Sequence, residues 1–130
     1  GKPILMAVFS SGQIVFGLPG NPVSVAVGLR FFVNQALRLM QGQSLEPKMK
    51  AINKSEYKKS KKFCFFAKAH TTVNAQGILE TNILSGQESF KLKPFNQTNS
   101  WAIIPEGLEA LKKDQEIEIV PLNMGESINP

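Results

Sequence analysis

The sequence predicts an α/β segment followed by an all-β domain. Two β-rich runs near the N-terminus are separated by Ser-Ser-Gly, which is a turn composition. A long apolar stretch follows and starts with Asn-Pro, a pair typical of a helix start. After that stretch, short β-rich runs alternate with turn residues, as in small β-barrels. We expect an α/β part at 1–45 and a β-barrel or β-clip at 46–130.

The first 42 residues are expected to form strand, turn, strand, loop and helix. Ile4–Phe9 and Gln13–Leu18 form the hairpin. Asn21 caps the helix, because its side chain can accept a hydrogen bond from the first turn. From Val23 to Met40 the chain is apolar on almost every face, and Gly42 ends the helix. A helix that is apolar nearly all round is buried or lies in a subunit interface.

The second part is expected to contain about five short strands after a linker at 43–50. Lys62–Val73 is a long strand, 74–77 is its turn and Ile78–Leu84 is its partner. Phe90–Phe95 contains Pro94, so that segment is an edge strand or irregular. The remaining expectations are a strand at Trp101–Ile104, a short connection at Leu108–Lys113 and a strand at Glu116–Leu122.

Composition excludes several classes of protein. The chain has 130 residues, of which 42% are hydrophobic and 19% charged, which is a folded, globular balance. One cysteine, Cys64, cannot form an internal disulfide, and with one histidine it cannot build a usual Cys/His zinc site. No apolar run reaches the roughly 18 residues of a membrane span, so we expect none, and we expect a cytoplasmic protein.

The net charge of +5 is unevenly distributed. Residues 50–68 hold seven lysines and one acid, whereas residues 101–130 hold six acids and two lysines. We interpret the basic run as a solvated, lysine-rich strand entry that resists edge aggregation. Nucleic-acid binding by residues 48–62 is an alternative. The basic run lacks arginine, the usual bidentate reader of bases and phosphates, which argues against that alternative.

The segment Phe16–Ser24 is the one most suited to chemistry. A strand runs into a Gly/Pro-rich loop and then into a helix N-terminus, where free N–H groups and the helix dipole favour an anion. Gly20 lets a ligand approach the backbone, and Pro19 and Pro22 stiffen the loop. A well-capped helix with no ligand is the alternative. The segment matches neither the phosphate-binding P-loop nor the dinucleotide-binding glycine motif.

Five motifs occur in the same order as in the molybdopterin molybdenumtransferases, the MoeA/gephyrin family. Val15–Ser24 resembles the signature of that family. Gly1-Lys2-Pro3 is similar to the end of its Lys-Pro-Gly-Lys-Pro motif, and Phe66-Ala67-Lys68 to its aromatic-x-Arg. Gly86-Gln87-Glu88-Ser89 resembles its Gly-x-Gln-Gly-Ser loop. Thr98–Gly107 resembles the closing Ala-Asn-Gly to Leu-Pro-Glu-Gly segment.

The resemblance implies the C-terminal portion of a larger, cytosolic, homodimeric enzyme. Residues 1–45 would be the last strands and helix of a three-layer, MoaB-like α/β domain that binds molybdopterin, and 46–130 the C-terminal β-clip domain. The family inserts molybdenum from molybdate into adenylylated molybdopterin, releases AMP and uses Mg²⁺. Its active site lies in a cleft between subunits, and its metal-binding acids would precede Gly1. This chain alone is therefore expected to be inactive.

The resemblance also implies a set of substrate or anion-binding residues. No catalytic residue and no metal ligand is assigned in this chain. Glu88 and Ser100 stand where the family has glycine, and Lys68 stands where it has arginine, so the site is expected to differ there. The expected binding residues are Lys2, Pro19, Gly20, Asn21, Pro22, Ser24, Lys68 and Ser89, with Ser89 reaching the site from the partner subunit.

Three further residues are expected to be structural. We expect Cys64 to be a small buried hydrophobe, His70 to lie on a strand surface and Trp101 to belong to the core. The leading function is an enzyme portion of molybdenum-cofactor biosynthesis that has small-molecule substrates, a homodimer partner and no nucleic-acid or membrane partner. A protein-binding scaffold of the same fold, without transferase activity, is the alternative.

Overall fold

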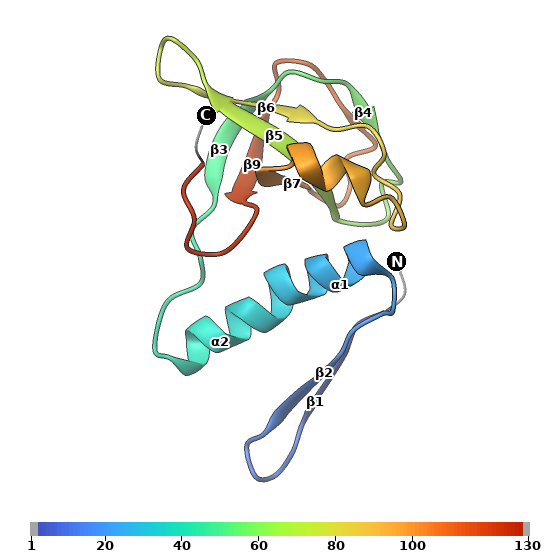
Figure 1. Ribbon diagram of the computed structural model, residues 1–130, viewed down its shortest axis with the longest axis vertical. Coiled ribbons are helices and arrows are strands. Elements are labelled where there is room, and N and C mark those ends of the chain that lie inside the picture. Colours follow the sequence, from blue (N-terminus) through green and yellow to red (C-terminus); the bar gives the residue numbers. More distant parts are fainter. Residues whose placement is uncertain (1–2, 129–130) are drawn as a thin grey trace. The chain divides into compact units, whose positions relative to one another are not determined.

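The computed structural model describes residues 3–128, which form two compact units (Figure 1). Among the described residues, the helical unit consists of 3–46 together with 88–92. The barrel unit consists of 47–87 and 93–128. The short return of the chain to the helical unit at 88–92 is not a feature that the sequence predicted. Whether the two units correspond to the family domains expected at 1–45 and 46–130 stays a prediction.

The helical unit begins with the predicted hairpin. β1 (Leu5–Val8) pairs antiparallel with β2 (Ile14–Gly17), and Leu5 lies opposite Gly17 at the open end. Gly12 in the connecting turn has φ of +84°, a backbone conformation that glycine adopts without strain. The hairpin prediction is confirmed, and each strand is shorter than expected by one residue at each end.

A helix of 19 residues follows, from Pro22 to Met40. It consists of α1 (Pro22–Gly28), a π-helical turn η1 (Leu29–Val33) and α2 (Asn34–Met40). Gly42, at φ +74°, follows its end as predicted. The π turn adds a residue to the helical repeat in the middle of the helix, so the two halves present different faces than an uninterrupted α-helix would. Composition gave no sign of this turn.

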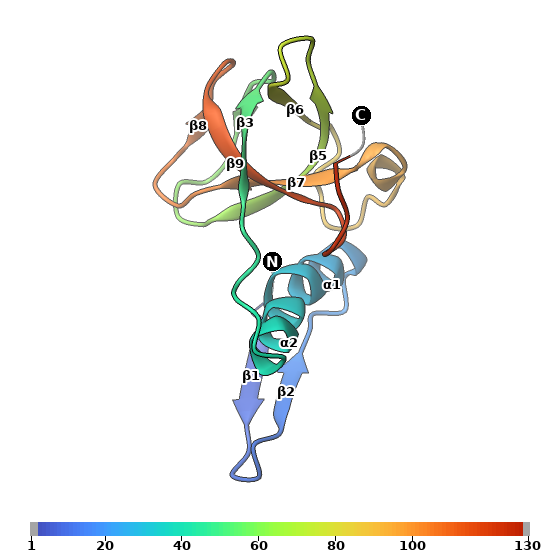
Figure 2. The same cartoon turned by 90° about the vertical axis from the view of Figure 1, so that its left-hand side faces the viewer.

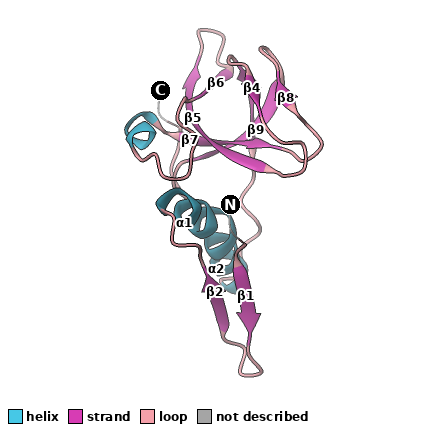
Figure 3. Cartoon of the chain, turned by 90° about the vertical axis from the view of Figure 1, so that its right-hand side faces the viewer, coloured by secondary structure: helices cyan, strands magenta, loops and turns pink. Residues whose placement is uncertain are grey.

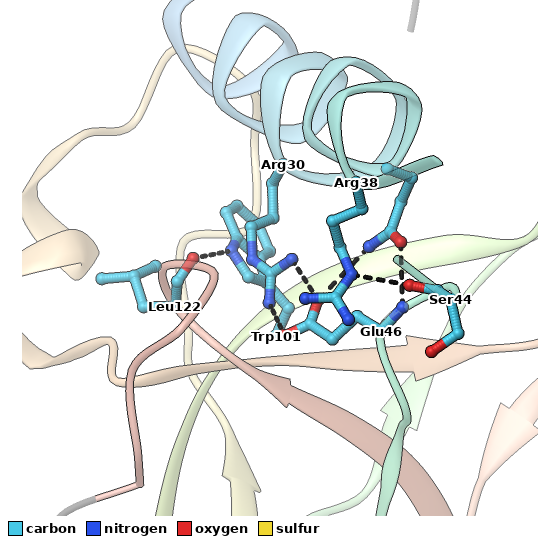
Figure 4. A network of polar contacts seen from close by, with 7 residues as sticks. Arg30, Arg38, Ser44, Glu46, Trp101 and Leu122 are labelled. Atoms are coloured by element: carbon cyan, nitrogen blue, oxygen red, sulfur yellow. Dashed lines mark hydrogen bonds and ion pairs between the residues drawn. The ribbon is translucent and has the colours of Figure 1, made fainter. Parts of the chain in front are cut away.

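A buried ion pair fastens the π turn to the segment after the helix (Figure 4). The guanidinium of Arg30 donates two hydrogen bonds to the carboxylate of Glu46, at 2.5 and 2.8 Å. The two side chains are only 5% and 10% exposed. Gln35 exchanges hydrogen bonds with Glu46 through its side-chain amide, and Arg38 Nε donates to the Ser44 carbonyl. These contacts fold the chain back along the helix after Gly42.

The helical unit leaves much of its apolar surface uncovered within the described residues. Of the two expected alternatives, the helix is therefore not buried within the described residues, and a place in a subunit interface stays a prediction. By length and composition alone, the helix from Pro22 to Met40 could cross a membrane, which counting uninterrupted apolar residues did not detect. Core helices of soluble proteins pass the same test, so the absence of a membrane span stays a prediction. The exposed large apolar side chains of the unit are Leu5, Met6, Val8, Phe9, Val15, Leu29, Phe32, Leu37, Leu39, Met40, Leu45, Phe90 and Leu92.

The barrel unit is a closed five-stranded barrel, as the sequence predicted (Figure 2). The order of the strands around the barrel is β3 (Met49–Asn53), β6 (Leu79–Ile83), β5 (Phe65–Val73), β7 (Ser100–Ile104) and β9 (Glu116–Pro121). Neighbouring strands are antiparallel except β3 and β6, which are parallel. Closure leaves no unpaired barrel edge.

Figure 3 shows the helices, strands and loops, and several boundaries in the barrel unit differ from the predictions. β3 begins inside the expected linker, and the expected long strand starts at Phe65 instead of Lys62. Residues 108–113, predicted as a connection, contain β8 (Ala110–Leu111), which pairs with β4 (Tyr57–Lys58). Pro94 lies in a short 3₁₀ helix, η2 (Lys93–Gln97), which confirms that this segment is irregular.

Small residues fill the barrel interior. Four alanines of β3, β5 and β7 are almost fully buried: Ala51, Ala67, Ala69 and Ala102. A barrel of few strands has a narrow interior, so alanine fits where larger side chains would collide. Ile104, Leu111, Ile117 and Ile119 complete the buried cluster. Trp101 is 1% exposed, which confirms its prediction as a core residue.

The basic and acidic runs of the sequence meet across β3 and β9. Ion pairs join Lys48 to Glu118 at 2.9 Å, Lys50 to Glu116 at 2.8 Å and Lys54 to Asp114 at 2.6 Å. Lys50 donates a hydrogen bond to the Glu116 carboxylate and Lys54 donates one to Asp114, and each bond raises the pKa of its lysine. Lys48 and two lysines of the basic run therefore pair with three of the six acids of the acidic run.

Asp114 is expected to make the stability of the barrel depend on acid pH. It has φ of +64°, and its hydrogen bond from Lys54 lowers the pKa of its carboxyl from the usual value of an aspartate. A lowered pKa stabilises the folded state above the unfolded pKa, and that contribution is lost as the pH falls through the folded pKa. Asparagine also tolerates a positive φ, so Asp114→Asn keeps the turn and removes the titrating carboxyl. We expect the variant to lose less barrel stability than the wild type between about pH 5 and pH 2. Urea unfolding across this range measures the free energy of unfolding, and an unchanged acid dependence would contradict the role of Asp114.

Candidate functional site

The predicted anion loop joins β2 to the helix. Gly17 ends β2, and Asn21 has φ of −81° and ψ of 129°, extended values that turn the chain into Pro22. The Asn21 side-chain oxygen accepts a hydrogen bond from the Val23 N–H at 3.2 Å, and its backbone carbonyl accepts from Val25 N at 2.9 Å. Asn21 is thus the N-cap and Pro22 the first helical residue, as predicted.

Gly20 leaves the loop backbone open. A Cβ atom placed on Gly20 would meet no atom within 4 Å, and Gly20 does not adopt a positive φ. Neither crowding within the chain nor backbone strain therefore requires glycine at this position. The open space is compatible with a ligand that approaches the main chain here, which is the role that the sequence predicted for Gly20.

Ser89 lies in the same unit as this loop. It belongs to the 88–92 segment, and its carbonyl oxygen accepts a hydrogen bond from Val23 N at 3.4 Å. The fold therefore brings Ser89 of this chain to the helix start, where Asn21 and Pro22 also lie. The Val23 N–H is shared between Asn21 and Ser89, so it is not free for an anion. The role of Ser89 in a partner's site stays a prediction.

Lys68 does not lie near solvent. It is 0% exposed on β5, so the interpretation of the basic run 50–68 as solvated is wrong for this lysine. Its Nζ donates to the Gly86 carbonyl at 2.7 Å and lies 5.5 Å from the centre of the Phe95 ring. Gln87, which was absent from the predicted site, bonds the Lys68 backbone in both directions. The glutamine in the Gly-Gln-Glu-Ser motif was the sequence signal for it.

The two departures from family glycines are accommodated without backbone strain. Asp114 is the one non-glycine residue with positive φ in the described part of the chain, so neither Glu88 nor Ser100 adopts that conformation. Glu88 is exposed and pairs with Lys91 at 2.9 Å. Ser100 is fully buried, and its hydroxyl lies 2.7 Å from Thr71 Oγ1. The glycine of this loop that adopts a positive φ is Gly86, at +75°.

The other residues singled out in the sequence have different outcomes. Lys2 lies outside the described residues. Cys64 is exposed, so its prediction as a buried residue is wrong; partial burial raises the pKa of its thiol. His70 is exposed on its strand, as predicted, and its Nδ1 lies 2.8 Å from the Gln97 carbonyl. Pro19 and Ser24 lie in the loop and the first helical turn.

No metal-binding cluster occurs in the described range. Residues 3–128 contain no group of three or more His, Cys, Asp or Glu side chains that could hold a metal ion. The carboxylate donors that magnesium prefers are therefore not assembled within this part of the chain, and the residues present do not fit such an ion.

Comparisons with known proteins point to one family. No family model matches the chain. The molybdopterin molybdenumtransferase of Synechococcus elongatus is 28% identical over 120 residues, 92% of this chain and 28% of the relative. The molybdopterin molybdenumtransferase of Haemophilus influenzae is 26% identical over 126 residues, which are 95% of this chain and 31% of the relative. A crystal structure of a molybdopterin biosynthesis MoeA protein from Pyrococcus horikoshii aligns with a TM-score of 0.68 and 25% identity, over 95% of this chain and 29% of that one. The chain spans somewhat over a quarter of the length of these relatives.

Proposed function

We propose that this chain, which resembles the molybdopterin molybdenumtransferases over about nine-tenths of its own length, is a functional portion of such an enzyme. The reaction would insert molybdenum from molybdate into adenylylated molybdopterin and release AMP. The observation that carries the proposal is the Leu18–Ser24 loop, whose open backbone at Gly20 precedes a capped helix start. The Val23 N–H is already bonded within the chain, but the helix dipole still favours an anion at the helix start, and both molybdate and the pterin phosphate are anions.

Within this proposal the chain supplies binding and not the metal chemistry. Pro19, Gly20, Asn21 and Pro22 would shape a pocket for an oxyanion, with Ser24 in the first helical turn. Magnesium would neutralise phosphate charge in the complete enzyme, but the described residues offer no carboxylate set for it. We therefore propose that the chain alone is inactive and that segments present in the relatives supply the metal site.

The uncovered apolar surface of the helical unit supports a subunit or domain interface. We propose a homodimer of the parent protein, located in the cytoplasm, in which this surface is covered. The same surface also favours the alternative, a protein-binding scaffold without transferase activity. The two functions differ in whether the parent protein consumes adenylylated molybdopterin.

The test uses the parent protein, expressed from its own gene with whatever precedes and follows this chain. It is mixed with adenylylated molybdopterin, magnesium and molybdate, and two products are measured: AMP and active enzyme formed from an apo-molybdoenzyme. We expect both to depend on molybdate. A folded parent that releases no AMP and activates nothing would contradict the transferase, and would favour the scaffold.

A further inference from the structure

We propose that Gln87 and the buried ammonium group of Lys68 are positioning residues that fix the loop carrying Ser89, and that Lys68 does not itself bind the anion. The role of Ser89 rests on the function proposed above, whereas the fixing of the loop does not. Gln87, Lys68 and Gly86 all belong to the barrel unit, and Ser89 follows Gln87 by two residues.

The Gln87 side chain extends the ladder between β5 and β6. The last residue pair of that ladder is Ala69 with Ile83. Beyond it, Leu84 N donates to the Lys68 carbonyl at 3.0 Å. The Gln87 amide then accepts from Lys68 N at 2.8 Å and donates to the carbonyls of Lys68 and Leu84, both at 2.7 Å. Because all three contacts are with backbone groups, the amide acts as one more peptide unit of the sheet.

The Lys68 side chain fixes the middle of the same loop. Its Nζ donates to the Gly86 carbonyl at 2.7 Å, and the Phe95 ring lies against it at 5.5 Å. The side chain is 0% exposed, so an anion could reach the ammonium only if the loop opened. A charged donor to a carbonyl is stronger than a neutral one, and the ring face favours a cation. This environment holds a loop in place and does not present a charge to a ligand.

The two residues therefore anchor positions 84, 86 and 87 to β5. A loop that is already ordered loses less entropy when a ligand binds, so its residues contribute more to affinity. Ser89 lies directly after the anchored positions, and its carbonyl contacts Val23 N at the helix start. Loosening the anchor is thus expected to disturb the Ser89 contribution to anion binding without removing any group that touches the anion.

The first test measures amide hydrogen exchange by NMR in the 130-residue chain. Gln87→Met and Lys68→Met keep side-chain length and remove the polar groups. Gln76→Met, in the exposed turn of the β5–β6 hairpin, is the matched control. We expect amides of residues 85–91 to exchange at least about tenfold faster in both variants and unchanged in the control. Unchanged exchange in Gln87→Met would overturn the proposal. If Lys68→Met does not fold, the result for Gln87→Met alone decides the test.

The second test measures molybdate affinity in the parent protein. If both are positioning residues, we expect Gln87→Met and Lys68→Met to weaken molybdate binding by similar factors. We also expect the double variant to bind molybdate no more weakly than the weaker-binding single variant. If Lys68→Met abolishes binding while Gln87→Met preserves it, Lys68 is a direct ligand and the proposal is wrong. Faster exchange with unchanged affinity in both variants would also overturn it. A wild-type parent without transferase activity contradicts the proposed function alone, because the exchange result does not depend on that activity.

Discussion

Glu46→Ala is expected to destabilise the helical unit by about 3–5 kcal/mol. The substitution removes the carboxylate that pairs with Arg30 and leaves a guanidinium that is 5% exposed without its charge partner. It also removes the acceptor for Gln35 Nε2, so the segment after the helix loses several of its contacts with the helix. Urea unfolding followed by the helical circular dichroism signal measures the effect.

The control for Glu46→Ala is Glu88→Ala in the same unit. Glu88 pairs with Lys91 on the surface, and an exposed pair contributes about 0–1 kcal/mol. The double variant Arg30→Met/Glu46→Leu removes both charges together and is expected to be far less destabilising than Glu46→Ala, because no buried charge is left unpaired. Equal losses in Glu46→Ala and Glu88→Ala would contradict the role assigned to the buried pair.

Trp101→Ala is expected to destabilise the barrel unit by about 3–5 kcal/mol. The indole is 1% exposed, packs edge-to-face on Phe95 at 5.7 Å and donates from Nε1 to the Leu122 carbonyl at 3.2 Å. Its loss leaves a cavity and removes the Nε1 donor from that carbonyl. Thermal and urea unfolding, read from barrel amide signals by NMR, measure the effect.

The control for Trp101→Ala is Phe63→Ala. Phe63 is also an aromatic residue of the barrel unit, but it is 68% exposed, so its truncation is expected to cost less than about 0.5 kcal/mol. Similar losses in the two variants would mean that Trp101 is not part of the barrel core in solution.

The elements that were predicted correctly are those with strong local signals. Asn21 and Pro22 identify a helix start through capping chemistry, and Gly42 identifies its end. The β5–β6 hairpin was predicted because its turn residues are flanked by β-rich runs. Each of these signals lies within a few residues of the structure that it specifies, so no tertiary information is needed.

The elements that were missed depend on partners far away in the sequence. β3 begins within a lysine-rich segment that reads as a linker, and its strand is completed by pairing with β9 about 70 residues later. The π turn at Leu29–Val33 contains Arg30, which pairs with Glu46. The spacing of apolar residues along the helix does not reveal that partner, because Glu46 lies outside the helix. Cys64 was misplaced because its phenylalanine neighbours indicate a core, whereas Phe63 itself is exposed.

The sequence predicted which residues belong to the candidate site better than it predicted which atoms those residues contact. The loop at Pro19–Pro22 follows from local chemistry, and the resemblance drew attention to Lys68 and Ser89. That Lys68 faces a carbonyl and a ring, and that Gln87 completes the sheet, required the fold of the barrel. Such contacts depend on side-chain direction across a closed barrel, which no spacing in the sequence specifies.

The most direct test of the central claim is molybdenum insertion by the parent protein carrying Pro19→Ala/Asn21→Ala. Asn21→Ala alone removes the helix cap at a cost of about 0.5–2 kcal/mol, so folding is first verified by helical circular dichroism. Ser11→Ala/Gln13→Ala, in the hairpin turn of the same unit, is the matched control. We expect the wild type and the control to activate an apo-molybdoenzyme and the folded loop variant to lose that activity. Full activity in the loop variant would contradict an anion pocket at this loop.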